Sequence, residues 1–165
     1  MTSSSTPDPL RAAVITVSDS CSRGERKDLS GPAVADVLKK HKFALAGTAT
    51  VPDEQPAIEQ ALLSWTARVP LVVTTGGTGI APRDITPEAT RTVCERTLEG
   101  VAERMRTEGA KKTPLAALSR AVCGVRGKSI ILNLPGSPAG AVQSLESVID
   151  LLPHALQLLN GNTQH

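Results

Sequence analysis

Three short apolar runs without polar alternation constrain most strongly what this chain can fold into. They span residues 12–17, 71–75 and 129–134. A strand with apolar side chains on both faces must be covered on both faces, which is typical of a parallel sheet flanked by helices. Segments of helical periodicity separate the runs, as in the apolar stripe of residues 58–65. We therefore expect an α/β fold of three layers, with a mostly parallel central sheet and helices on both faces.

Weaker signals indicate the remaining elements. The sequence predicts a strand over 43–51, helices over 30–42, 101–108 and 139–160, the last interrupted at Pro153, and a turn over 123–128. Ser30, Asp53 and Thr86 each stand at the expected start of a helix. A Ser, Thr or Asp side chain there can accept a hydrogen bond from an otherwise unpaired backbone N–H, so we expect all three to be N-caps.

Length and composition indicate one folded domain. The 165 residues fit a single domain, which we expect over residues 11–161, between a flexible tail (1–10) and a short C-terminal tail (162–165). Hydrophobic residues at 40% and charged residues at 21% exclude a disordered chain. No apolar run approaches the ~18 residues of a membrane span. The first ten residues lack the basic flank and apolar core of a signal peptide.

Charge and cysteine content argue against nucleic-acid partners and against zinc or disulfide sites. A net charge of +2 is too small to indicate nucleic acid, and one Phe, one Trp and no Tyr leave little to stack on single strands. Three widely separated cysteines without CxxC spacing argue against a zinc site or a disulfide framework and favour a reducing compartment. We expect a cytoplasmic protein that handles small molecules, without nucleic-acid or membrane partners.

Small, polar or acidic segments follow four of the expected strands. They are residues 18–20, 52–54, 75–79 and 135–137. In an open parallel sheet, ligands bind outside the carboxyl ends of the strands. We therefore expect these four segments to meet at one edge of the sheet and to form the binding site.

The segment 76–79, with the sequence Gly-Gly-Thr-Gly, is the candidate anion site. Closely spaced glycines allow successive backbone N–H groups to point at one anion. The segment lacks both the Gly-Lys-Ser/Thr of a Walker A loop and the spacing of a GxGxxG motif. From the residues alone, a phosphate cradle and a tight turn without a ligand are both open.

Asp53 and Asp84 are the second candidate feature. Each carboxylate alone is typical of a helix start. Together, beside a phosphate loop, they would repel an anionic ligand unless a cation lay between them, and Mg²⁺ bound by carboxylates and substrate phosphates resolves that conflict. The residues alone therefore suggest Mg²⁺-dependent nucleotide or phosphate chemistry. Arg120 keeps two interpretations, a cation for an anionic substrate or one half of a surface ion pair.

Five segments, in order along the chain, resemble the molybdenum-cofactor biosynthesis family that includes MogA, MoaB and the G domain of gephyrin. The most specific is TTGGTGIAPRDITPEAT, at residues 74–90. The others are VSDS (17–20), VPDE (51–54), PLAALSRAVCGVRGK (114–128) and LNLPGS (132–137). The resemblance covers residues 11–159, and the VSDS and SRAVCGVRGK stretches are more similar to gephyrin-like G domains than to divergent MoaB paralogues.

This resemblance implies a MogA-like molybdopterin-binding fold and an adenylyltransferase activity. Active members of the family join AMP from Mg-ATP to the terminal phosphate of molybdopterin and release pyrophosphate. The family's two functional aspartates match Asp53 and Asp84, which would be catalytic and could hold Mg²⁺. The other matching residues would bind nucleotide and pterin: Ser18, Asp19, Ser20, Thr75, Gly76, Gly77, Thr78, Gly79, Arg83, Pro135, Gly136 and Ser137.

The resemblance also implies an assembly and a partner. Members of the family are commonly homotrimers, and the adenylylated pterin is used by a separate molybdate-insertion activity. Some MoaB-type members share the fold without serving as the adenylyltransferase. A non-catalytic molybdopterin-binding protein is therefore the alternative function.

Overall fold

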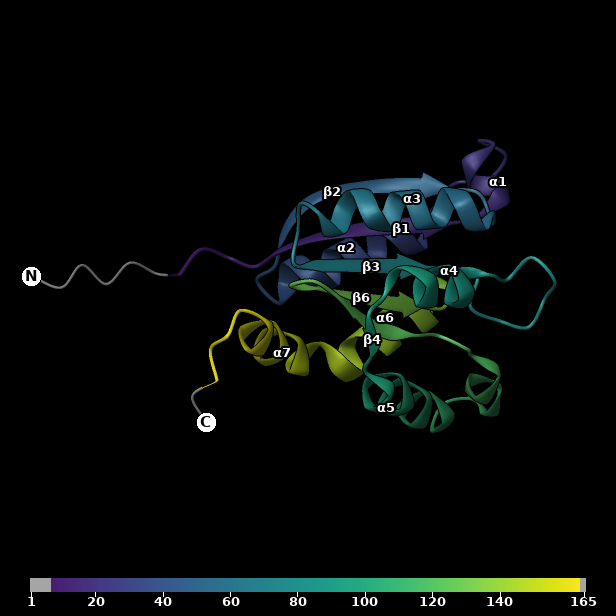
Figure 1. The fold of residues 1–165 in the computed structure, drawn as a ribbon. Coiled ribbons are helices and arrows are strands. Elements are labelled where there is room, and N and C mark those ends of the chain that lie inside the picture. The colour runs from purple at the N-terminus through teal and green to yellow at the C-terminus, as the bar shows by residue number, and fades with distance from the viewer. Residues whose placement is uncertain (1–6, 164–165) are drawn as a thin grey trace, which may run out of the picture.

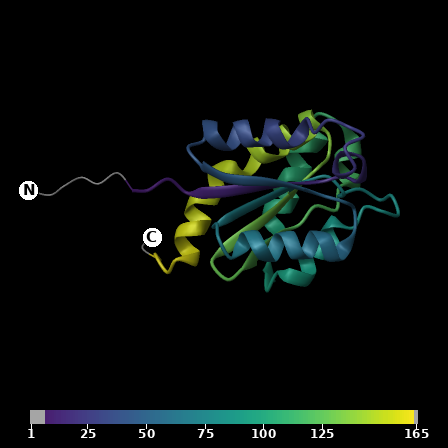
Figure 2. The ribbon, with the colours of Figure 1, turned by 90° about the horizontal axis from the view of Figure 1, so that it is seen from above.

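The computed structural model describes residues 7–163 and shows a six-stranded sheet between two layers of helices (Figure 1, Figure 2). The strands β2, β1, β3 and β6 are parallel neighbours, and β5 and β4 extend the sheet as antiparallel strands. The expected three-layer, mostly parallel α/β fold is confirmed. The strands are β1 (Arg11–Val17), β2 (Ala44–Val51), β3 (Leu71–Thr75), β4 (Arg96–Thr97), β5 (Cys123–Arg126) and β6 (Ser129–Leu134).

Helices connect the strands and cover both faces of the sheet. The interruption predicted at Pro153 is confirmed in position, since the helix expected over 139–160 is divided into α6, η2 and α7, with Pro153 in the first turn of α7. No helix within residues 7–163 has the length and apolar character needed to cross a membrane. The helices are α1 (Asp19–Ser22), α2 (Ser30–Lys40), α3 (Gln55–Thr66), α4 (Thr86–Val93), α5 (Glu99–Ala110), η1 (Pro114–Leu118), α6 (Pro138–Val148), η2 (Ile149–Leu151) and α7 (Leu152–Leu159).

Two hydrophobic clusters lie on opposite faces of the sheet. The larger contains apolar residues of α2, α5, α6 and α7, and the smaller contains those of α3 and α4. Along β1, Ala12 and Val14 belong to the first cluster, whereas Ala13 and Ile15 belong to the second. The run without alternation is therefore buried on both faces, as the sequence predicts.

The expected tails fall largely outside the described residues, which exclude 1–6 and 164–165. Leu10, placed in the N-terminal tail, is held by the fold. Its carbonyl accepts the N–H of Ala44 at 2.8 Å, and its side chain packs against the larger cluster. The tail boundaries themselves stay predictions.

The three expected N-caps are wrong. Ser30 and Thr86 are the first residues of α2 and α4, and Asp53 lies two residues before α3. The side chain that bonds near the start of α2 is that of Asp28, which accepts the N–H of Gly31 at 2.9 Å. The side chains of Asp53 and Thr86 bond to segments distant in the sequence instead, as described below.

The turn expected over 123–128 is also partly wrong. Residues Cys123–Arg126 form β5, and a turn at Gly127, with φ +57°, joins it to β6. The short β4 and the helices α1 and η1 are not predicted by the sequence. Each spans two to five residues, which is too short for hydrophobic periodicity to indicate it.

One buried side chain, Asn133 of β6, joins four segments beneath the carboxyl edge of the sheet. Its amide nitrogen donates to the hydroxyl of Thr74 at 3.0 Å and to that of Thr90 at 2.9 Å. Its amide oxygen accepts the N–H of Val122 at 3.1 Å. The strands β3 and β6, helix α4 and the segment before β5 are thereby fixed to one another.

We predict that Asn133→Ala lowers the free energy of unfolding by roughly 3 kcal/mol, because it leaves several buried polar groups without partners. Denaturant unfolding followed by circular dichroism measures this loss. Asn162→Ala, at an exposed position, is the control and should leave stability unchanged. A loss below ~1 kcal/mol for Asn133→Ala would show that the buried network contributes little.

Candidate active site

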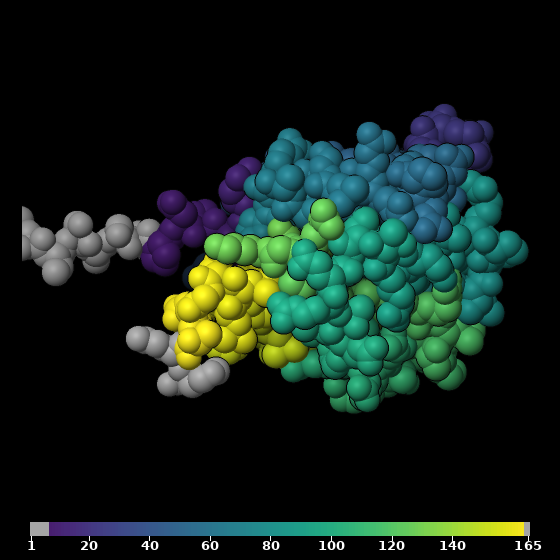
Figure 3. Space-filling model, viewed as in Figure 1, coloured from purple at the N-terminus to yellow at the C-terminus, as the bar shows by residue number. Residues whose placement is uncertain are grey.

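The carboxyl ends of β1, β2, β3 and β6 meet at the end of the sheet opposite the start of β1, and the segment between β3 and α4 projects from that end (Figure 1, Figure 3). Backbone hydrogen bonds continue between the strands there. The N–H of Ser18 donates to the carbonyl of Val51 at 2.9 Å, and the N–H of Gly76 donates to that of Leu134 at 3.0 Å. The four polar segments expected at one edge are brought together.

Asp19 and Asp53 hold each other through reciprocal hydrogen bonds. The N–H of Asp19 donates to Oδ2 of Asp53, and the N–H of Asp53 donates to Oδ1 of Asp19, both at 3.0 Å. Ser18 is the N-cap of α1, where its Oγ accepts the N–H of Cys21 at 3.2 Å and lies 3.3 Å from Oγ of Ser20. Asp53 therefore supports the short helix α1 instead of α3.

Arg83 closes this cluster from the loop after β3. Its Nε and Nη2 donate to the two carboxylate oxygens of Asp19, at 2.6 and 3.0 Å. This hydrogen-bonded guanidinium lowers the pKa of Asp19 to about 2. Asp19 is therefore an anion at any physiological pH, and its charge is paired with that of Arg83.

Asp53 carries the opposite shift. Partial burial raises the pKa of its carboxyl, and the negative charges of Asp19 and Asp84 raise it further. This environment disfavours the ionised carboxylate of Asp53. A cation bound next to Asp53 would offset that negative charge and would therefore be bound favourably. The site thus holds one carboxylate neutralised by an arginine and a second whose charge is opposed by burial and by its neighbours.

The loop 76–79 is tied through all four of its carbonyl groups. Two residues provide the donors. Thr86 donates from Oγ1 to the carbonyl of Gly76 at 2.9 Å and from its N–H to that of Gly77 at 3.1 Å. Arg120 donates from its N–H to the carbonyl of Thr78 and from Nε to that of Gly79, both at 2.8 Å.

The amide side of the same loop is left free. Within the part of the chain that the structure describes, the N–H groups of Gly77, Thr78 and Gly79 meet no protein acceptor. Unpaired N–H groups in partly buried backbone require water or a ligand, and successive ones form an anion-binding concavity. The geometry therefore favours the phosphate cradle over the tight turn without a ligand.

Asp84 lies against this loop. Its Oδ2 accepts the N–H of Ala81 at 2.9 Å, and its own N–H donates to the carbonyl of Ala81 at 2.9 Å. A Cβ atom built on Gly79 would stand 2.8 Å from Oδ2 of Asp84, and one built on Gly77 would stand 3.1 Å from Oδ1 of Asp53. The two carboxylates therefore approach the glycine loop at its two ends.

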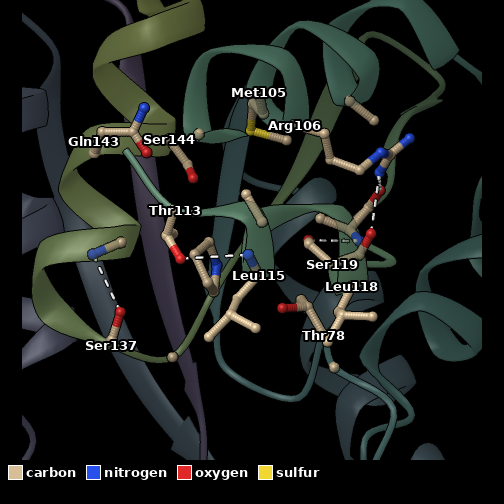
Figure 4. A pocket seen from close by; sticks show the side chains of 18 of the residues that line it. Thr78, Met105, Arg106, Thr113, Leu115, Leu118, Ser119, Ser137, Gln143 and Ser144 are labelled. Atoms are coloured by element: carbon tan, nitrogen blue, oxygen red, sulfur yellow. Dashed lines mark hydrogen bonds between the residues drawn. The ribbon is translucent and has the colours of Figure 1, made fainter. Parts of the chain in front are cut away.

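A cavity of about 460 Å³ opens beside the loop (Figure 4). The predicted residues that line it are Gly77, Thr78, Gly79, Asp84, Pro135, Gly136 and Ser137. Its opposite walls come from α5, η1 and α6, which the sequence did not single out as a site. These walls contribute Met105, Arg106, Leu115, Leu118, Gln143 and Ser144, among others. Apolar spacing along these helices indicates packing, so no local signal separated cavity residues from core residues.

Several predicted site residues do not line this cavity. Ser18, Asp19, Ser20, Asp53 and Arg83 form the neighbouring cluster, and Gly76, the first residue of the loop, does not line the cavity either. Thr75 is fully buried, and its hydroxyl donates to the carbonyl of Pro135 at 2.7 Å, which joins the glycine loop to the segment 135–137.

The donor set fits Mg²⁺ only with help from a substrate. Across residues 7–163, no group of three or more His, Cys, Asp or Glu side chains is arranged to hold a metal ion. Asp53 and Asp84 each use Oδ2 to accept a backbone N–H, which leaves Oδ1 for a cation. One or two carboxylates completed by phosphates and water are the usual Mg²⁺ site in phosphoryl-transfer enzymes.

A family described as a probable molybdopterin binding domain matches residues 13–154. The chain is 42% identical over 160 residues to the molybdopterin adenylyltransferase of Helicobacter pylori J99, covering 93% of this chain and 89% of that protein. It is 41% identical to the molybdenum cofactor synthesis protein cinnamon of Drosophila melanogaster, of whose length it spans only 26%.

The fold is similar to that of the molybdopterin biosynthesis enzyme MoaB from Thermus thermophilus. The TM-score is 0.87 at 52% identity, and the match covers 92% of this chain and 97% of that one. A MogA structure matches with a TM-score of 0.85 at 39% identity. These are whole-chain identities, so the expected similarity of two segments to gephyrin-like G domains stays a prediction.

Gly76 and Gly127 provide a matched pair for testing the loop. Both have positive φ, at +104° and +57°, but a Cβ on Gly76 would meet the carbonyl oxygen of Val17 whereas one on Gly127 meets open space. We predict that Gly127→Ala costs about 1 kcal/mol of unfolding free energy and Gly76→Ala clearly more. Chemical denaturation of both variants measures the difference, and equal losses would contradict the crowding of Gly76.

Because the pKa of Asp53 is raised, we predict that replacing its carboxyl group increases thermal stability in a pH-dependent way. The folded state holds the Asp53 proton more tightly than the unfolded state, so the contribution of this group to stability falls as pH rises through its folded pKa. Asp53→Asn keeps an oxygen for the N–H of Asp19. Its melting temperature should exceed that of the wild type by roughly 1–3 °C at pH 7.5 and converge with it near pH 4.

Thermal scans from pH 4 to 8 measure this trend. Asp36→Asn, at an exposed position of α2, is the control and should show no such convergence. If Asp53→Asn melted below the wild type at pH 7.5, the ionised carboxylate would be a stabilising group and the argument would be wrong.

Proposed function

Because this chain belongs to the molybdenum-cofactor biosynthesis family of molybdopterin-binding domains, we propose that it is a molybdopterin adenylyltransferase. Its relatives of about 40% identity over most of their length carry that name. The substrates would be molybdopterin and ATP, and the products adenylylated molybdopterin and pyrophosphate.

One observation carries the proposal. Gly77, Thr78 and Gly79, whose N–H groups have no protein acceptor among the described residues, line the same cavity as Asp84, and Asp53 stands beside the loop. Donors for phosphate and acceptors for a cation are the complementary requirements of adenylyl transfer, which depends on positioning and charge neutralisation. A merely structural glycine turn would not need both.

In the proposed reaction, an oxygen of the terminal phosphate of molybdopterin attacks the α-phosphorus of ATP. A new P–O bond forms, and the bond between the α-phosphorus and the oxygen that bridges to the β-phosphorus breaks. That oxygen leaves with pyrophosphate and keeps the electron pair. A phosphate monoester is mostly ionised at neutral pH, because its second pKa is about 6, so the site needs no strong general base.

Different residues would bind the phosphates, the cation and the ring of a substrate. The N–H groups of Gly77, Thr78 and Gly79 would hold nucleotide phosphate oxygens in place and stabilise the charge on them. Asp53 and Asp84 would hold Mg²⁺, which when bound offsets negative charge on the phosphates and the departing pyrophosphate. The apolar wall at Met105, Leu115 and Leu118 would receive ring surface of a substrate, since this cavity has no aromatic side chain.

The finer parts of the proposal come from the resemblance. We propose that the protein acts as a homotrimer in the cytoplasm and passes the adenylylated pterin to a separate molybdate-insertion protein.

A non-catalytic molybdopterin-binding protein is the second candidate function. It is motivated by the 52% identity to the Thermus MoaB, because some MoaB-type members share the fold without serving as the adenylyltransferase, although that relative is itself named an enzyme. Such a protein would bind the pterin and form no product from ATP.

We predict that the purified protein transfers label from α-³²P-ATP to molybdopterin and that this transfer requires Mg²⁺. Asp53→Asn and Asp84→Asn should each lower turnover at least ~100-fold while pterin binding persists, because each removes charge that neutralises the reacting phosphates. Thin-layer separation of labelled products measures turnover, and fluorescence titration measures binding. Pterin binding without labelled product in the wild type would establish the non-catalytic alternative.

A further inference from the structure

Arg120 makes an unusual set of contacts for a residue at the protein surface. Its side chain is 38% exposed, yet its three guanidinium nitrogens all have acceptors. Nε donates to the carbonyl of Gly79 at 2.8 Å, and Nη2 donates to the carbonyl of Asp84 at 2.6 Å. Nη1 bonds to the carboxylate of Glu88, an ion pair that also lowers the pKa of Glu88.

These contacts connect two parts of the segment after β3 with different proposed roles, phosphate binding by the glycine loop and cation binding by Asp84. The carbonyl of Gly79 belongs to the glycine loop, and the carbonyl of Asp84 belongs to the residue proposed to hold the cation. Glu88, on the first turns of α4, fixes the orientation of the guanidinium. We propose that Arg120 is a positioning residue, which sets where Asp84 lies relative to the glycine loop.

The geometry of the peptide bond shows which backbone N–H groups the Arg120 side chain positions and which it does not. In a planar trans peptide the carbonyl of one residue and the N–H of the next point in opposite directions, so fixing the first fixes the second. Thr86 fixes the N–H groups of Gly77 and Thr78, and the backbone N–H of Arg120 fixes that of Gly79. The phosphate cradle therefore does not depend on the Arg120 side chain.

The placement of Asp84 does depend on that side chain. Without the guanidinium, the carbonyls of Gly79 and Asp84 lose their donors, and the segment 80–85, which runs from Gly79 through Asp84 to the start of α4, is held by fewer contacts. Because a displacement of ~1 Å can reduce a rate 100-fold, turnover should fall while nucleotide affinity is kept. This inference rests on the proposed adenylyltransferase function.

The test compares Arg120→Ala and Arg120→Lys with the wild type. Arg120→Ala should lower kcat at least ~10-fold and leave KM for ATP within about twofold. Arg120→Lys keeps the charge but cannot form the planar fork to two carbonyls and a carboxylate, so its kcat should fall nearly as far. Guanidinium ion at millimolar concentration should partly restore kcat to Arg120→Ala and not to the wild type.

A second measurement does not depend on activity. Hydrogen exchange of backbone amides over residues 80–85 should become severalfold faster in Arg120→Ala and stay unchanged in residues 76–79. Arg104→Ala is the control, since its ion pair with Asp150 joins two residues that do not line the cavity. It should keep both kcat and the exchange of the loop.

The outcomes separate the two proposals. An inactive wild type overturns the adenylyltransferase function, and hydrogen exchange then still decides whether Arg120 holds the loop. An active wild type whose kcat and loop exchange are unaffected by Arg120→Ala overturns the positioning role. A rise in KM for ATP with kcat unchanged also overturns it, because the residue would then act on binding.

Discussion

The buried amide of Asn133 is the contact on which the geometry of the site depends. It fixes α4 through Thr90 and the segment before β5 through Val122. These are the two segments that supply Thr86 and Arg120, the residues that tie the glycine loop. A polar group buried in the sheet must be fully paired, and its pairing here determines where both ends of the loop are held.

The site also concentrates features that do not favour folding. Asp53 is partly buried beside two other carboxylates, and its pKa is raised as a result. The loop after β3 leaves three N–H groups without protein partners among the described residues. Such arrangements are characteristic of sites that bind a ligand, since unpaired backbone groups need water or a ligand and perturbed carboxylates cluster where a protein binds or reacts.

The sequence predicted the parts of this structure that depend on local patterns. The runs at 12–17, 71–75 and 129–134 indicated buried parallel strands because both faces of each are apolar, and the edge that carries the site followed from that topology. Asp53 was misassigned as the N-cap of α3, because its partner Asp19 is 34 residues away and no local rule indicates that pairing. The turn expected over 123–128 contains the four-residue strand β5, whose pairing with β6 is tertiary.

The opposite wall of the cavity could not be predicted for a related reason. Met105 and Leu115 become lining residues only because α5 and η1 pack at a particular distance from the loop. Arg120 was left between two interpretations, and the structure shows an ion pair with Glu88 together with bonds to the loop backbone.

The origin of the two walls has a consequence for how relatives of this chain can diverge. The loop side of the cavity is backbone held by backbone and by the two donor residues Thr86 and Arg120, so few side chains there can change without disturbing it. The α5 and η1 side is formed by side chains such as Leu115 and Leu118, half or more exposed, which can be exchanged without breaking a hydrogen bond of the loop. Mutation can therefore change the shape of the cavity on this side while the glycine-loop side is inherited unchanged.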